Sequence, residues 1–190
     1  MECLWGIDFG ARRSGKTAVA IANEGKVYFH QVEKGKDTDA WLEKLMEKYP
    51  PTMVAIDAPL SLPAGWCGGI GDLFYRQCDE ELKAMSPLFL GGLTGRAVKF
   101  SRKARAAGID IIEAYPKGVV AKLLNCEYPE VGEDLTPLLD LLPEGTDIQL
   151  TAQPTNEHQL DALICLVTAF RFSAKEAMTF GKYGEGLIYV

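Results

Sequence analysis

Short apolar stretches and alternating positions predict three strands at the start of the chain. Residues 4–8 form a short apolar run that ends in an acid. Residues 17–22 alternate between Ala and β-branched side chains, which is the period of a half-buried strand. After a polar turn that contains a glycine, residues 27–32 are again rich in strand formers. These three segments predict an antiparallel meander.

A helical period appears next and leads into a buried strand. Residues 37–48 place Trp41, Leu42, Leu45 and Met46 on one face, and two prolines end the segment. Residues 53–57 are a continuous apolar run that ends in an acid. Such a run after a helix is typical of a strand that pairs in parallel inside a sheet. The order of elements therefore predicts an α/β domain with a mixed sheet flanked by helices.

The rest of the chain predicts one domain that spans residues 1–190. Within it, residues 58–108 are predicted to be an insert of loops and helices that contacts the substrate, with one helical piece at 72–84. The other predicted elements are a basic helix at 95–107, a strand at 109–113, helices at 116–124 and 133–142, a helix that begins after Asn156, and an edge strand within 181–190.

The composition is that of a globular protein, and its charge limits the kinds of partner. The chain has 190 residues, 47% of them hydrophobic and 24% charged, which excludes disordered and fibrous classes. Its 20 Lys and Arg against 26 Asp and Glu give a net charge of −6. A protein of this charge does not coat nucleic acid by bulk attraction, so any nucleic-acid contact needs a local basic patch.

Other features predict a cytoplasmic protein without a membrane segment. The five cysteines are widely spaced with no CxxC pair, and the first residues lack the basic and apolar stretches of a signal peptide. The longest nearly apolar run, residues 162–170, is far shorter than the roughly 20 residues that cross a bilayer. With two histidines in all, a Cys/His zinc site is not expected, and a bound metal would be a hard ion held by carboxylates.

Acidic residues stand at the ends of three predicted strands. Asp8, Asp57 and Glu113 each follow an apolar run, and Asp161 interrupts the apolar stripe of the last helix. Ligands bind at the ends of neighbouring strands in an α/β sheet, so these acids are expected to converge. Converging carboxylates raise each other's pKa, and a divalent cation removes that repulsion. Each acid alone is equally well explained as a turn or cap residue, and only their repetition favours a site.

Several segments spread over almost the whole chain carry a family resemblance: residues 6–10, 54–63 (VAIDAPLSLP), 75–79, 112–116, 160–169 (LDALICLVTA) and 184–190. They resemble the ribonuclease H-like superfamily and, more closely, domain-of-unknown-function family 429, a family of predicted nucleases with that fold. The resemblance implies that Asp8, Asp57, Glu113 and Asp161 bind Mg²⁺ or Mn²⁺ and form the catalytic set. Two such ions stabilise the attacking and leaving oxygens of a phosphodiester. The resemblance names no substrate.

A second motif competes with this interpretation. Residues 10–17 (GARRSGKT) fit the P-loop pattern, and residues 54–57 would serve as its Walker B strand. A P-loop needs a helix that begins at the GKT, however, whereas residues 17–22 alternate like a strand and run into a turn. We therefore expect a hairpin loop here, in which Arg12, Arg13 and Lys16 meet a substrate phosphate.

A basic stretch follows the irregular region. Residues 95–108 hold five Lys and Arg and no acid. Lys99, Arg102 and Lys103 lie on one helical face, and they are either a phosphate-contacting patch or a solvated surface.

The leading hypothesis is a metal-dependent nuclease that acts on nucleic acid. One alternative is an NTPase or kinase that uses the P-loop motif at residues 10–17, which a strand at residues 17–22 would exclude. The other is a non-catalytic interaction module that keeps the fold, which the net acidity also suits. The sequence leaves open whether the substrate is DNA, RNA, a junction or a small nucleotide, and it leaves open the oligomeric state.

Overall fold

An eight-stranded mixed sheet runs through the computed structural model, which describes residues 2–190. Neighbouring strands among β1, β2 and β3 are antiparallel, while β1, β4, β5 and β8 are parallel. This is the mixed α/β sheet with an antiparallel meander that the sequence predicts. In spatial order the strands are β6 (Gln149–Leu150), β3 (Lys26–Gln31), β2 (Ala18–Asn23), β1 (Leu4–Asp8), β4 (Met53–Asp57), β5 (Asp110–Ala114), β8 (Gly186–Tyr189) and β7 (Thr179–Lys182).

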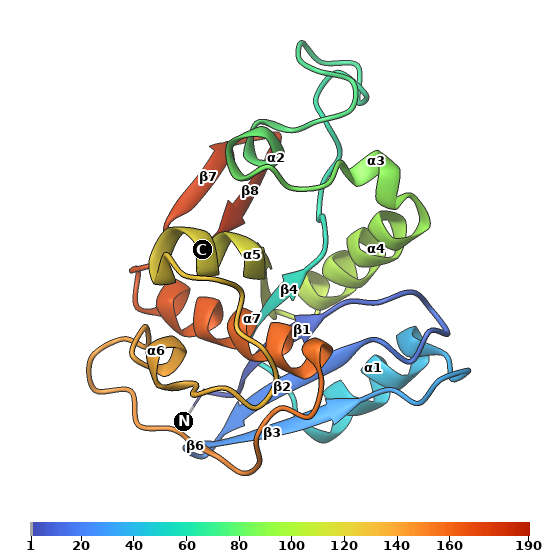
Figure 1. Ribbon diagram of the computed structural model, residues 1–190. Helices are drawn as coiled ribbons and strands as arrows, with labels where there is room; N and C mark the ends of the chain where they lie inside the picture. The colour runs from blue at the N-terminus through green and yellow to red at the C-terminus, as the bar shows by residue number, and fades with distance from the viewer. Residues whose placement is uncertain (1) are drawn as a thin grey trace.

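Helices cover both faces of this sheet (Figure 1). Helix α7 packs on one face, and α1 and α4 pack on the other. Within residues 2–190, none of the helices is long and apolar enough to cross a membrane. The helices are α1 (Thr38–Lys48), α2 (Gln77–Leu82), α3 (Pro87–Leu90), α4 (Gly92–Ala106), α5 (Pro116–Val119), α6 (Thr136–Leu139) and α7 (Glu157–Ser173), and a π-helical turn, η1 (Val120–Leu124), follows α5.

Successive side chains of a strand point to opposite faces of the sheet, so the hydrophobic core is divided into two parts, one on each face. Leu4 and Ala20 face α7, whereas Trp5 and Ile7 face α1 and α4. These side chains are buried in both cores, since they are at most 3% exposed. The same alternation decides which acidic side chains lie on which face of the sheet.

Helix α7 approaches β1 unusually closely at Gly6. A Cβ atom added to Gly6 would lie 2.1 Å from the carbonyl oxygen of Ala162 and 2.2 Å from the amide nitrogen of Leu166. Small side chains on the neighbouring strands of this face, such as Ala20 and Ala55, also let the helix approach. The absent side chain at Gly6 therefore sets the distance between the end of β1 and the first turns of α7.

Replacing Gly6 with Ala is expected to destabilise the protein by about 3 kcal/mol or more, because backbone atoms of α7 cannot yield to the new methyl group. The control is Gly95, which lies inside α4, where an added Cβ would meet no atom of a neighbouring element within 4 Å. Gly95→Ala is expected to stabilise the protein by about 0.5–1 kcal/mol. Urea denaturation of both variants measures the two changes, and a Gly6→Ala protein as stable as the wild type would contradict this packing.

The N-termini of helices α1 and α7 follow the sequence signals. Asp37 caps α1 by accepting hydrogen bonds from the amides of Asp39 and Ala40, at 3.0 and 3.3 Å. Asn156 caps α7 by accepting from the amide of Gln159 at 3.1 Å. The Gln159 side chain accepts from the amide of Thr155 rather than from that of the cap residue.

The hairpin loop between β1 and β2 excludes the P-loop alternative. Residues 18–23 form a strand paired with β1 and β3, where a P-loop requires a helix. The Thr17 hydroxyl accepts a hydrogen bond from the amide of Gly10 at 2.9 Å, which closes the loop on itself. The alternative of an NTPase or kinase that uses a P-loop at residues 10–17 is therefore wrong, and the predicted hairpin loop is confirmed, because a strand and not a helix follows the motif.

The C-terminal segment departs from the sequence prediction. One edge strand is expected within residues 181–190, but the structure has a hairpin of β7 and β8. Strand β8 pairs in parallel with β5 and lies inside the sheet. Strand β5 itself ends at Ala114, one residue beyond Glu113. The predicted helix at 72–84 is confined to α2, and that at 133–142 to the single turn α6.

Candidate active site

Two acids end adjacent parallel strands and lie side by side. Asp8 is the last residue of β1 and Asp57 the last residue of β4, and the two are partners in the strand register. Adjacent strands are about 4.8 Å apart, and register partners point to the same face. That face is the one covered by α7, because Gly6, two residues before Asp8, contacts this helix.

The first two turns of α7 bring two further side chains to this point. The imidazole Nδ1 of His158 lies 2.7 Å from Oδ2 of Asp8. Asp161 follows His158 by three residues, so the two project from the same side of the helix. The hydroxyl of Tyr128 donates a hydrogen bond to Oδ1 of Asp161, which ties this carboxylate to the loop before α6.

The electrostatics of the acids indicate that they share one region. Burial raises the pKa of Asp8 to about 8, with the charges of Asp161 and Glu157 adding to the effect. The pKa of Asp57 is raised well above its ordinary value by burial and by the neighbouring charges of Asp8, Asp161 and Glu113. Burial also raises the pKa of Asp161. In the absence of a cation these carboxylates therefore repel one another.

Two lysines flank the acids and partly offset this repulsion. The charge of Lys16, in the hairpin loop, offsets part of the rise in the pKa of Asp8. Lys117, from α5, lowers the pKa of both Asp57 and Asp161. Both lysine side chains are exposed, so they stand at the rim of the site. Lys16 is one of the predicted phosphate contacts, whereas the sequence interpretation did not include Lys117.

Glu113 lies next to these acids, but its carboxylate is hydrogen-bonded to Arg76. Its register partner in β4 is Ile56, which packs in the core against α1 and α4, so Glu113 is directed to the sheet face opposite Asp57. Both of its carboxylate oxygens accept hydrogen bonds from Arg76, at 2.6 and 2.7 Å, and one also accepts from the amide of Leu60 at 2.8 Å. The structure therefore brings Asp8, Asp57 and Asp161 together, and pairs Glu113 with Arg76.

Arg76 is the centre of a buried ionic network. Its side chain is fully buried and bonds to Asp79 and Glu113 through its guanidinium nitrogens. Asp79 is also buried. Ser61 accepts a further hydrogen bond from Arg76 at 2.9 Å. The network links three parts of the chain: the segment that follows β4, helix α2 and strand β5. It lies beside Asp57 in the wall of one cavity.

The donor set suits a hard divalent ion, although the side chains do not form a closed metal site as they stand. Within residues 2–190, no three His, Cys, Asp or Glu side chains form a group that could hold a metal ion. In the same part of the chain, however, the half-buried carboxylate of Asp57 has no hydrogen-bond partner. Carboxylate oxygens are the preferred ligands of Mg²⁺ and Mn²⁺. An acid without a hydrogen-bond partner, close to the charges of Asp8 and Asp161, therefore fits such an ion.

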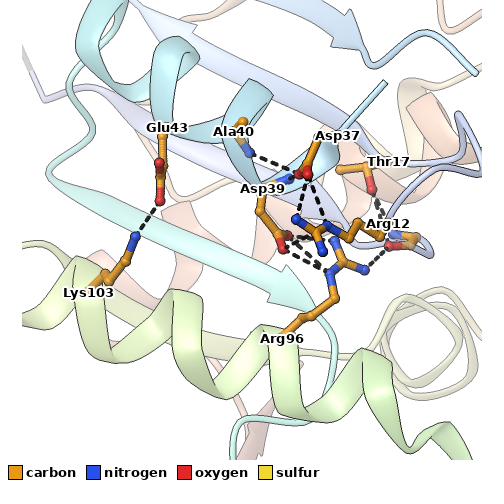
Figure 2. Close-up of polar contacts among 9 residues, drawn as sticks. Arg12, Thr17, Asp37, Asp39, Ala40, Glu43, Arg96 and Lys103 are labelled. Carbon is orange, nitrogen blue, oxygen red and sulfur yellow. Dashed lines mark hydrogen bonds and ion pairs between the residues drawn. The ribbon is translucent and has the colours of Figure 1, made fainter. Parts of the chain in front are cut away.

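The predicted phosphate-contacting residues divide into two groups. The first group forms ion pairs with α1 and its cap (Figure 2). Arg12, in the hairpin loop, pairs with Asp37 at 2.6 Å, and Lys103, in α4, pairs with Glu43 of α1. Arg96 of α4 adds an ion pair with Asp39 of α1 and donates a hydrogen bond to the carbonyl oxygen of Gly10 in the hairpin loop. The other group is exposed and forms no ion pair within the described residues; it consists of Arg13, Lys16, Lys99 and Arg102.

Helix α4 carries its basic face away from the three acids. Ala97, Phe100 and Ala104 pack it into the core on the side of the sheet opposite α7. Lys99 and Arg102 therefore lie across the sheet from Asp161, and the structure does not bring them to the site. Their role in binding phosphate stays a prediction.

His158 is the site residue that the sequence interpretation missed. The small number of histidines argues against a zinc site, and on that ground His158 was not expected at the site. One local signal was present, since His158 lies one helical turn before Asp161 on the face predicted to reach the site. The partner of its ring, Asp8, is 150 residues away, and no local pattern identifies that contact.

Comparison with known proteins yields likenesses to solved structures and no family. No family model matches the chain, and no curated protein matches it significantly. Among solved structures, that of Thermus thermophilus RuvC superposes with a TM-score of 0.46 and 16% sequence identity, over 90% of this chain and 96% of that one. Membership of domain-of-unknown-function family 429 therefore stays a prediction.

Proposed function

We propose that this protein hydrolyses phosphodiester bonds of nucleic acid with divalent metal held by Asp8, Asp57 and Asp161. The observation that carries the proposal is the convergence of three carboxylates from β1, β4 and α7, whose pKa values are all raised. Clustered acids of this kind destabilise a fold unless they serve a bound cation or a reaction. No Lys or Arg side chain forms an ion pair with any of the three within the described residues, and the side-chain partners of Asp8 and Asp161 are His158 and Tyr128.

Each residue has a distinct role in the proposed reaction. When bound, Mg²⁺ or Mn²⁺ would supply charge stabilisation for the attacking and leaving oxygens. Asp8, Asp57 and Asp161 would hold the metal. His158 hydrogen-bonds to Asp8 through Nδ1, which would orient the ring, and its Nε2, 3.6 Å from Oε1 of Glu157, would accept or donate a proton at the reacting phosphate. Lys16 and Lys117 at the rim would bind the phosphate backbone.

The first experiment measures cleavage of labelled single-stranded and duplex oligonucleotides with Mn²⁺, Mg²⁺ or EDTA. We expect metal-dependent cleavage by the wild type and a loss on the order of 10³-fold or more in Asp57→Asn. Asp147→Asn is the matched control, because this aspartate is exposed and lies outside the site. Mn²⁺ affinity, measured by calorimetry, should fall in Asp57→Asn alone. Equal Mn²⁺ affinity in all three proteins would reject the site.

Removing the hydroxyl of Tyr128 is expected to slow cleavage without unfolding the protein. Tyr128→Phe deletes the hydrogen bond that orients the Asp161 carboxylate, and loss of such supporting contacts costs about 10–100-fold in activity or metal affinity. Tyr183→Phe is the control, since this tyrosine is 91% exposed. Steady-state cleavage and Mn²⁺ titration provide the measurement. If both variants behave like the wild type, Tyr128 does not position Asp161.

A further inference from the structure

A cavity of about 230 Å³ opens beside the acids, at the ends of β1, β4 and β5. Asp8 and Asp57 form part of its wall, and Tyr115 lies at the end of β5. Its lining also includes apolar side chains from α3, from the start of α4 and from the loop before α3, among them Leu90, Leu93 and Met85.

The charges around this cavity disfavour a phosphate inside it. Four of its lining residues are acids: Asp8 and Asp57, which would be neutralised by the proposed metal, and Asp79 and Glu113, which lie away from it. The single basic residue in the lining, Arg76, is held by Asp79 and Glu113 and has no net positive charge to offer. The exposed lysines, Lys16 and Lys117, are not part of the lining. An anionic ligand group is therefore expected at the rim, and a neutral group inside.

The size and the polar groups of the cavity suit a single flat aromatic ring. Cavities for drug-sized ligands measure about 300–1,000 Å³, so a cavity of about 230 Å³ holds a smaller group. The half-buried hydroxyl of Tyr115 has no hydrogen-bond partner within residues 2–190, which leaves it available to the edge of such a ring. The apolar side chains of Leu90 and Leu93 offer contact surface for its faces.

We propose that this cavity binds one nucleobase of the substrate, unstacked from its neighbours, and so sets the adjacent phosphate beside Asp8 and Asp57. The inference rests on the proposed phosphodiester hydrolysis and narrows its substrate class. A base that is stacked and paired in a duplex is not free to enter a cavity, whereas a base in a single strand or a distorted duplex is. The preferred substrate is accordingly single-stranded, or paired so weakly that one nucleotide is released.

The test uses a single-stranded oligonucleotide with one 2-aminopurine, whose fluorescence rises when the base leaves the stack. With Ca²⁺ to limit turnover, binding of the wild type is expected to raise the fluorescence. Leu93→Trp, which fills the cavity, should remove most of this rise. Phe89→Trp is the matched control, because Phe89 is 64% exposed and lies outside the cavity lining. Met85→Trp narrows the cavity from an exposed position and serves if Leu93→Trp does not fold.

The outcomes separate the cavity from the reaction. No fluorescence rise in the wild type, or an equal rise in the cavity-filling variant and the control, would overturn the base-binding inference. Cleavage is measured separately with Mn²⁺ on single-stranded and duplex substrates. Cleavage without a fluorescence rise rejects the cavity alone. A rise that Leu93→Trp removes, in a protein that cleaves none of the substrates, rejects the proposed hydrolysis and keeps the cavity as a nucleobase site.

Discussion

Replacing Asp8 with asparagine is expected to abolish phosphodiester hydrolysis and, at the same time, to make the metal-free protein more stable. Activity should fall on the order of 10³-fold or more, because one of the three proposed metal-binding carboxylates is lost. Stability should rise because Asp8 is 14% exposed and lies among like charges. Asparagine keeps the size of the side chain and a donor or acceptor for His158, but carries no charge to desolvate.

The sign of the pH dependence follows from the pKa of Asp8. Folding raises it from 3.8 to about 8, so between these values the folded protein binds a proton that the unfolded chain releases. The stability of the metal-free wild type therefore falls as pH rises through this window. The Asp8→Asn variant lacks this contribution, and its advantage should grow from near zero at pH 3.8 to on the order of 2 kcal/mol or more at pH 8.

Urea denaturation in EDTA at several pH values measures this difference, with Asp147→Asn as the control that should follow the wild type. Adding Mn²⁺ should stabilise the wild type and the control, since a ligand that binds the folded state shifts the unfolding equilibrium. It should stabilise Asp8→Asn less. An Asp8→Asn protein less stable than the wild type at pH 8 would show that the carboxylate is needed for the fold itself.

Replacing Arg76 with methionine is expected to destabilise the protein by about 3–5 kcal/mol, the range for breaking a buried ion pair by removing one partner. The loss leaves Asp79 and Glu113 buried without a counter-charge, at a place where Arg76 is fully buried. The same change loosens the connection between β5 and the segment that contributes apolar side chains to the cavity. Cleavage should therefore weaken together with stability.

Two comparisons test whether the buried charges cause this effect. Arg12→Met removes an exposed ion pair with Asp37 and should change stability little. The double variant Arg76→Met/Glu113→Gln removes one of the two carboxylates that Arg76→Met leaves without a counter-charge, and it should be more stable than Arg76→Met alone. Denaturation curves give the three free energies of unfolding. If Arg76→Met and Arg12→Met have equal effects, burial of the Arg76 network does not determine its strength.

Much of the fold follows from local patterns in the sequence. Alternation over residues 17–22 predicts a strand in the face of a competing P-loop motif, and the structure has β2 there. The apolar runs before Asp8 and Asp57 predict buried strands, and their parallel pairing brings the two acids together. The cap at Asn156 predicts the start of α7 and thus the placement of Asp161 near its beginning. Each of these inferences depends on residues within a few positions of one another, where the period of the backbone dictates the structure.

Long-range contacts decided the rest. The register of β5 against β4 directs Glu113 toward Arg76 and away from Asp57. The fold also set His158 beside Asp8, paired Arg12 and Lys103 with acids of α1 and its cap, and placed β8 inside the sheet.

The sequence by itself therefore determined strands β1 to β5, the three long helices α1, α4 and α7, and the mixed sheet, and it named Asp8, Asp57 and Asp161 as candidate metal ligands. Tertiary structure decided which charged groups pair with one another and which acids remain available for a metal. The physical reason is that secondary structure depends on neighbours along the chain, whereas a charge is neutralised by whichever group the packing brings within hydrogen-bond distance. One residue of strand register is enough to change that partner, because successive side chains point to opposite faces of a sheet.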